Sequence, residues 1–133
     1  MYQTYAYFYV LGFESAPAAI SRRLGLKPDK IWLKGEDWLP QNPRKFNNWQ
    51  VHSSLEQSEI FLDAHLPSVL NIIEPKRVEI LKLRDEGCDV GINCVGYYYN
   101  EHPGFHLSAK LIARLAAFSM DTDFDLYCLD KDT

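Results

Sequence analysis

The pattern of apolar, aromatic and polar positions is typical of β-strands in three segments of the chain. Residues 2–11 are largely apolar or aromatic on both faces, which predicts a central strand of a sheet. Residues 88–98 and 123–129 alternate more regularly and predict two further strands. The apolar positions expected to face the core are Phe8, Val10, Val90, Ile92, Phe124 and Leu126.

Apolar residues at helical spacing separate these strands. The first predicted helix starts at Ser15, a good capping residue, and ends at Gly25, which tolerates a left-handed conformation. Residues 55–73 predict a second helix that Ser54 caps and that Pro67 kinks or splits near residues 63–65, because a proline ring clashes with the preceding turn.

Two more helices are predicted further along the chain. Pro75 opens one that runs to Glu86, and Ser108 caps the other. We expect their buried stripes to consist of Val78 and Leu81 in the first, and of Leu111, Ile112, Leu115 and Phe118 in the second.

A turn-rich stretch near the middle of the chain contains all three tryptophans, Trp32, Trp38 and Trp49. Residues 31–38 and 48–53 have strand composition, and residues 40–44 between them are rich in turn formers. The pattern predicts an inserted tryptophan-rich hairpin with a polar, basic tip. Trp49 alternates with Gln50 and His52, so we expect Trp49 to be buried.

The chain repeats itself weakly. Gly12, Phe13 and Ile20 recur as Gly104, Phe105 and Ile112 at one constant spacing, and the order of predicted elements recurs with them. A real repeat would imply two βαβ units in a ferredoxin-like antiparallel sheet of about five strands, with the helices on one face. The strands over 2–11 and 88–98 would then adjoin at its centre. Alternatively, these few identities arise by chance and there is no repeat.

Length and composition are those of a globular α+β domain. The 133 residues, 47% hydrophobic and 24% charged, predict a single domain over 1–133 with its own core. A net charge of −4 argues against nucleic acid as the main partner. No apolar run reaches the roughly 18 residues of a membrane span, and three cysteines without zinc-like spacing suit a reducing compartment. We expect a cytoplasmic protein without a membrane partner.

No motif predicts catalysis, a metal or a cofactor. His102 and His106 flank a Pro-Gly turn, and Asp121, Asp123 and Asp125 alternate along a strand, so neither group supplies the ligand set that zinc or calcium requires. The cysteines follow the apolar phase of their strands, as small core residues do. We therefore expect no enzymatic activity.

Tyrosines form the most distinctive pattern in the chain. Six of them fall, by the period of two, on the sheet face opposite the helices: Tyr5, Tyr7, Tyr9, Tyr97, Tyr99 and Tyr127. An exposed platform of this kind would bind a protein partner or a second copy of the chain. Alternatively, the hairpin with its tryptophans folds over the platform and encloses an aromatic pocket for a small molecule. Stacking of single-stranded RNA is a third interpretation, which the acidic balance disfavours.

Short motifs spread over the chain resemble one family. They are Leu24-Gly25-Leu26-Lys27-Pro28, Lys34-Gly35-Glu36, Asn48-Trp49-Gln50-Val51-His52-Ser53, Phe105-His106-Leu107-Ser108 and Asp125-Leu126-Tyr127. These motifs are similar to those of the mainly bacterial domain of unknown function 4279. The resemblance implies a compact α/β domain and brings no assigned activity or catalytic residue.

The function predicted from these observations is binding rather than catalysis. We expect an intracellular protein-binding module, with an immunity-type (toxin-neutralising) role suggested by analogy with orphan families of similar size. The alternative is a small-molecule binder that uses an aromatic pocket under the tryptophan hairpin.

Overall fold

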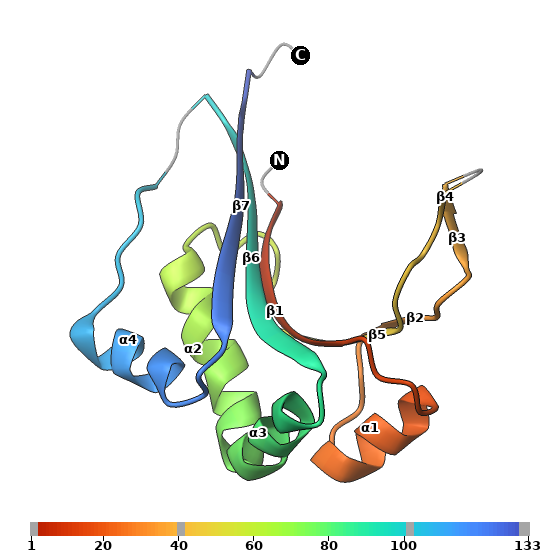
Figure 1. Cartoon of the computed structure of the whole chain (residues 1–133). Coiled ribbons are helices and arrows are strands. Elements are labelled where there is room, and N and C mark those ends of the chain that lie inside the picture. Colours follow the sequence, from red (N-terminus) through yellow and green to blue (C-terminus); the bar gives the residue numbers. More distant parts are fainter. Residues whose placement is uncertain (1–2, 40–41, 101–102, 131–133) are drawn as a thin grey trace.

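A five-stranded sheet with helices on one face forms the protein (Figure 1). The computed structural model describes residues 3–39, 42–100 and 103–130. The sheet has the order β2-β5-β1-β6-β7. Its strands are β1 (Gln3–Leu11), β2 (Lys30–Trp32), β5 (Asn48–His52), β6 (Asp89–Tyr99) and β7 (Asp121–Leu129). The α+β class predicted from the sequence is confirmed.

β1 and β6 lie side by side at the centre, as the sequence predicted, and pair along the whole length of β1. Their antiparallel register runs from Gln3 opposite Tyr97 to Leu11 opposite Asp89. β5 is antiparallel to β1 on the other side, and β2 is antiparallel to β5. β7 is parallel to β6, so the prediction of a purely antiparallel sheet is wrong. A crossover through a helix returns the chain to the same end of the sheet, and such a connection makes neighbouring strands parallel.

Two βαβ units are present, but they differ in whether another strand lies between their two parallel strands. In β1–α1–β2, strand β5 lies between the two parallel strands, whereas β6 and β7 are direct neighbours around α4. The resulting strand order differs from that of a simple ferredoxin-like fold.

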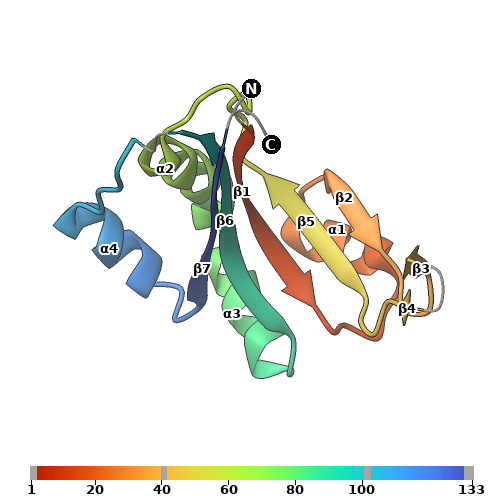
Figure 2. The ribbon, with the colours of Figure 1, turned by 90° about the horizontal axis from the view of Figure 1, so that it is seen from above.

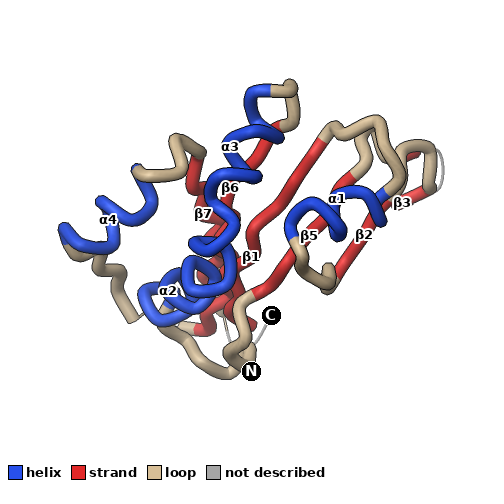
Figure 3. The backbone as a smooth tube through the Cα atoms, turned by 90° about the horizontal axis from the view of Figure 1, so that it is seen from below, coloured by secondary structure: helices blue, strands red, loops and turns tan. Residues whose placement is uncertain are grey.

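Within the described residues, four α-helices accompany the sheet: α1 (Pro17–Leu24), α2 (Leu62–Ile73), α3 (Arg77–Asp85) and α4 (Ala109–Ala116). Seen from below, α1 crosses β5 and β2, while α2 and α3 cross the central strands (Figure 3). The core lies between these layers, because every second residue of β1 from Thr4 to Val10 is buried toward the helices. Trp49 is fully buried there. Its ring packs edge-on against Phe8, and its Nε1 donates to Ser21 Oγ at 3.0 Å.

The predicted start of the second helix is wrong. Residues 55–61 form no helix, and α2 begins at Leu62 after Phe61, whose side chain makes no capping bond. Buried His65 holds this segment instead, because its Nε2 donates to the Glu59 carbonyl at 2.8 Å and its Nδ1 lies 2.9 Å from Ser53 Oγ. These tertiary hydrogen bonds outweigh the local capping signal. Pro67 sits inside α2, where the sequence predicted a kink or a break.

The helix that follows is rotated relative to the prediction. Val78 is 64% exposed, while Ile80 and Leu83 face the core. A 3₁₀ turn, η1 (Glu74–Lys76), leads directly into α3 (Arg77–Asp85). Since a 3₁₀ turn holds three residues rather than 3.6, it shifts the face that the following helix turns inward.

β7 is much less covered than its alternation predicted. Phe124 and Leu126 are 38% and 50% exposed, Cys128 is also exposed, and Ile112 of α4 is 51% exposed. The expected burial of these four side chains is therefore wrong. Figures 2 and 3 show α4 beside β7 rather than beneath it, so none of the described helices covers this part of the sheet.

Between β2 and β5 the chain extends as a second antiparallel ladder of β3 (Asp37–Leu39) and β4 (Asn42–Pro43). We call residues 33–39 and 42–47 the arm. It rises on the side of the sheet opposite the helices (Figure 1). Asn47 fastens its base: Oδ1 accepts from the Lys34 N–H at 2.7 Å, and Nδ2 donates to the Phe13 carbonyl at 2.8 Å. The Gly12 N–H donates in turn to the Asn47 carbonyl.

Replacing the buried tryptophan tests the core. Trp49→Ala should lower the free energy of unfolding by about 3–5 kcal/mol, because a large aromatic is lost from a fully packed site. The matched control is Phe46→Ala at a 55% exposed site, which should stay within about 0.5 kcal/mol of the parent. Urea denaturation measures both. Equal effects of the two variants would contradict the packing described here.

Candidate functional site

The face of the sheet opposite the helices, which we call the open face, carries the predicted tyrosines. β1 contributes Tyr5, Tyr7 and Tyr9; the pairing register places Tyr97 and Tyr99 of β6 and Tyr127 of β7 on the same side. Figure 2 looks down onto this face. The tyrosines are partly exposed, Tyr127 most of all at 45%. The structure thus brings all six together on one surface.

The rings on the open face stack in two groups. Tyr97 and Tyr127 lie parallel on neighbouring strands, with centroids 4.7 Å apart. Tyr5 and Tyr7 stack along β1, and His52 of β5 lies against both, 4.9 Å from Tyr7 and 5.9 Å from Tyr5. Stacked neighbours restrict one another, so the face presents rigid aromatic area at low entropic cost.

Polar side chains connect these groups across the strands. Nδ2 of Asn93 donates to the Tyr7 hydroxyl at 2.9 Å and to Asp125 Oδ2 at 3.1 Å. The Tyr9 ring lies over Gly91, where any Cβ would collide with the tyrosine hydroxyl. Glycine at this point of β6 therefore makes room for the ring.

Carboxylates surround Tyr9 at the β7 side of the open face. Burial, reinforced by the charges of Asp89, Asp123 and Asp121, raises the pKa of Tyr9 to about 12. Burial also raises the pKa of Asp89, and Asp121 and Asp123 add to the effect. The phenol therefore remains a neutral hydrogen-bond donor beside a concentration of negative charge.

The three tryptophans, which the sequence grouped together, are separated in the structure. Trp32 lies on the open face at its β2 end, since it pairs with Asn48, and the Arg44 guanidinium lies 4.2 Å from its ring centroid. Trp49 points into the core on the other side of the sheet. Trp38 belongs to β3, but its side chain lies outside the described part of the structure. Only Trp32 is thus seen to join the tyrosine surface.

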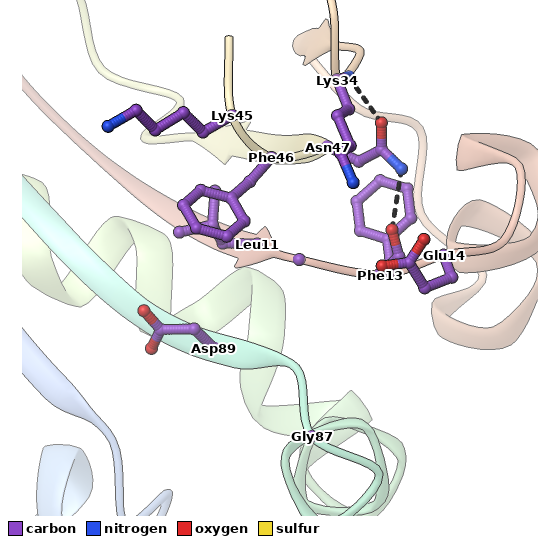
Figure 4. Close-up of a pocket in the computed structure, with 10 residues that line it drawn as sticks. Leu11, Phe13, Glu14, Lys34, Lys45, Phe46, Asn47, Gly87 and Asp89 are labelled. Carbon is purple, nitrogen blue, oxygen red and sulfur yellow. Dashed lines mark hydrogen bonds between the residues drawn. The ribbon is translucent and has the colours of Figure 1, made fainter.

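A cavity of about 350 Å³ lies where the base of the arm meets the ends of β1 and β6 (Figure 4). Phe13, Phe46 and Leu11 give it an apolar part. Its charged lining residues are Lys34, Lys45, Glu14 and Asp89. Figure 4 shows Asp89 on one side and Lys45 with Phe46 on the other. Neither Trp32 nor Trp49 lines it, so the cavity differs from the tryptophan pocket envisaged from the sequence.

Within the described ranges, no three side chains of His, Cys, Asp or Glu are grouped so as to hold a metal ion. His102, considered above as a metal ligand, lies outside those ranges. None of the described helices has the length and apolarity that crossing a membrane requires.

Comparison with models of protein families shows which family the chain belongs to. The model of one family, described as a domain of unknown function, matches residues 2–129. The chain belongs to domain of unknown function 4279. The match confirms the resemblance carried by the short motifs, and it extends from β1 to β7, so that both the open face and the helix-side core lie within domain 4279. No curated protein and no solved structure matches the chain.

Two residues of the open face, His52 and Asn93, were not among the site residues predicted from the sequence. His52 shares its strand face with Gln50, a pattern visible in the sequence, but its contact with Tyr7 depends on β5 pairing with β1. Asn93 occupies the phase of β6 that faces away from the core, yet its two hydrogen bonds depend on the β1–β6–β7 order. Strand order, which local patterns do not encode, was the missing information.

The titration of His52 tests the environment of the open face. Burial, and secondarily the charge of Lys30, lowers the pKa of His52 below its ordinary 6.5, while Asp29 opposes the shift. The folded state therefore favours the neutral ring. The contribution of His52 to stability should be complete above about pH 6.5 and should fall as the pH drops toward the lower folded pKa.

Lys30→Ala should move the pKa of His52 upward but leave it below 6.5, since burial is the larger cause. An NMR titration of the imidazole resonances measures this change, with Lys27→Ala as the charge-matched control. A pKa above 6.5 in the parent protein would contradict the structure.

Proposed function

We propose that the chain is a non-catalytic protein-binding module whose open face recognises a partner carrying basic groups. The observation that supports this most directly is the gathering of six partly exposed tyrosines, with His52, on the sheet face opposite the described helices. Tyrosine supplies a large contact area and a hydrogen-bonding hydroxyl at little entropic cost, which explains its enrichment at protein interfaces.

The charges of the open face favour a basic partner. Asp89, Asp121, Asp123 and Asp125 follow the β6–β7 side, and all four are exposed. Positive charge lies at the opposite end, where Lys30 belongs to β2 and Arg44 covers Trp32. Such a distribution attracts a basic surface toward the β7 side and speeds its encounter. Neutralising a basic toxin, as an immunity protein does, would be one use of this kind of binding.

A peptide-display selection against the immobilised chain tests the proposal. We expect the enriched peptides to be rich in Lys and Arg. Tyr7→Ser combined with Tyr97→Ser should weaken their binding by about 2 kcal/mol or more, the usual cost of truncating central interface aromatics. Circular dichroism should show that the fold survives, because both rings lie outside the helix-side core.

Charge variants provide the matched control for this experiment. Asp121→Asn with Asp123→Asn should slow association and reduce its dependence on salt, whereas Asp85→Asn on α3 should change neither. Selection of peptides without basic residues would argue against the open face as the binding surface. So would equal effects of the open-face aspartate variant and the Asp85 variant on association. Unfolding of the double tyrosine variant would show instead that the rings form a second core.

The cavity beside the arm supports a second candidate function, the binding of a small zwitterionic molecule such as a free amino acid. Lys34 and Lys45 suit a carboxylate, and Glu14 and Asp89 suit an ammonium group. The 350 Å³ volume lies within the range of small-ligand sites, at its lower end.

Thermal-shift measurements with a panel of free amino acids test this candidate. A ligand should raise the melting temperature of the parent protein, and Asp89→Asn with Phe46→Ala should remove that increase. Asp85→Asn should preserve it. The absence of any shift across the panel would exclude free amino acids as ligands of the cavity.

A further inference from the structure

β7 forms a long, regular and exposed edge of the sheet. It pairs with β6 over nine consecutive residues without a bulge, and no other strand of the described residues pairs with its outer side. Proteins usually protect such edges with a proline, charged side chains, a bulge or a covering helix or loop, because unpaired backbone groups recruit another strand. The sequence of β7, DTDFDLYCL, contains neither proline nor lysine, and its charged side chains, Asp121, Asp123 and Asp125, all lie on the open face.

The outward backbone groups can be identified. The Asn100 N–H donates to the Leu129 carbonyl, so that carbonyl points toward β6. Because the backbone groups of a strand alternate from side to side, those of Cys128, Leu126, Phe124 and Thr122 point away from the sheet. Another strand could therefore add to β7 through these four residues.

Exposed apolar side chains concentrate on the same strand. Phe124, Leu126, Tyr127 and Leu129 are all at least 36% exposed. Phe105 packs edge-on against Phe124. Together with Leu126 and Cys128, Phe105 also lines an apolar hollow beside β7. Burial of these side chains against a second apolar strand would be favourable.

We propose that a second copy of the chain pairs antiparallel with β7 about a twofold axis at Leu126. Leu126 then lies opposite its own copy, and Phe124 lies opposite Cys128 of the second copy. All of these residues have outward backbone groups, so the pairing makes complete hydrogen bonds. Five strands from each copy join in one continuous sheet.

The aspartates select this register. Around Leu126, Asp125 lies opposite Tyr127 of the second copy and Asp123 lies opposite Leu129. Centring on Asp125 would place two Asp125 carboxylates face to face, and centring on Phe124 would oppose Asp123 to Asp125. Like charges directly opposite each other destabilise a sheet. A register about Tyr127 also avoids such pairs, but it is shorter, so the longest favourable pairing is the one about Leu126.

Salt distinguishes this dimer from the binding of a basic partner. The two Asp125 residues become diagonal neighbours at roughly 7–8 Å, a repulsion that salt screens. Salt should therefore tighten the dimer, whereas it weakens the association of a basic partner with the open face. The dimer uses the edge of β7 and does not depend on the proposed function.

Sedimentation of the full chain tests the pairing. With rising protein and salt concentration, the mass should double from 15.4 kDa. Leu126→Pro removes an outward N–H without breaking a β6–β7 bond, so this variant should remain monomeric. Leu126→Ala keeps the N–H and should still form a dimer, though a weaker one. If the proline variant unfolds, Leu126→Lys, which places a charge at the axis, serves in its place.

Disulfide trapping tests the register. In a Cys128→Ser background, Leu126→Cys should cross-link to its own copy under mild oxidation, because paired residues lie within disulfide reach. Thr122→Cys should not, since the two copies of residue 122 would lie roughly 26 Å apart along the strand. A parent protein that stays monomeric at high concentration and salt, or equal cross-linking at both positions, overturns the proposal.

Discussion

The antiparallel pairing of β1 with β6 is the constraint on which the rest of the structure depends. It joins residues 3–11 to residues 89–99, so most of the chain lies in the loop that this pairing closes. β5 and β7 attach to its two sides, and α2 packs against both central strands. Loop closure of this length costs entropy before any contact compensates for it. Formation of the central pair should therefore limit the rate of folding.

Local sequence patterns predicted most of the helices and strands, but they predicted less well which elements pack against one another. The apolar and aromatic character of both faces of β1, and the alternation in β6, identified two central strands. Phe124 and Leu126 have the same alternation but stay exposed, since burial also requires a helix above them. The start of α2 was missed for a related reason. Ser54 carries a capping signal, but His65 holds the preceding segment through contacts distant in sequence.

The candidate site shows the same limit. The period of two was sufficient to place the tyrosines on one face, because strand geometry alone determines it. The stacking of His52 on Tyr7 and the bridge from Asn93 to Asp125 needed the strand order and register as well. The tryptophans were grouped by sequence distance, but neighbouring residues of a strand face opposite sides, and β5 turns Trp49 into the core.

The separation of charge along the open face has a consequence for geometry. Carboxylates lie along β7 and basic groups lie near β2, so the surface carries a dipole directed across the strands. A dipole exerts a torque on an approaching charged body, whereas a uniform charge only attracts it. An elongated partner with charges of opposite sign at its two ends would therefore be oriented across the strands before it contacts the tyrosine rings.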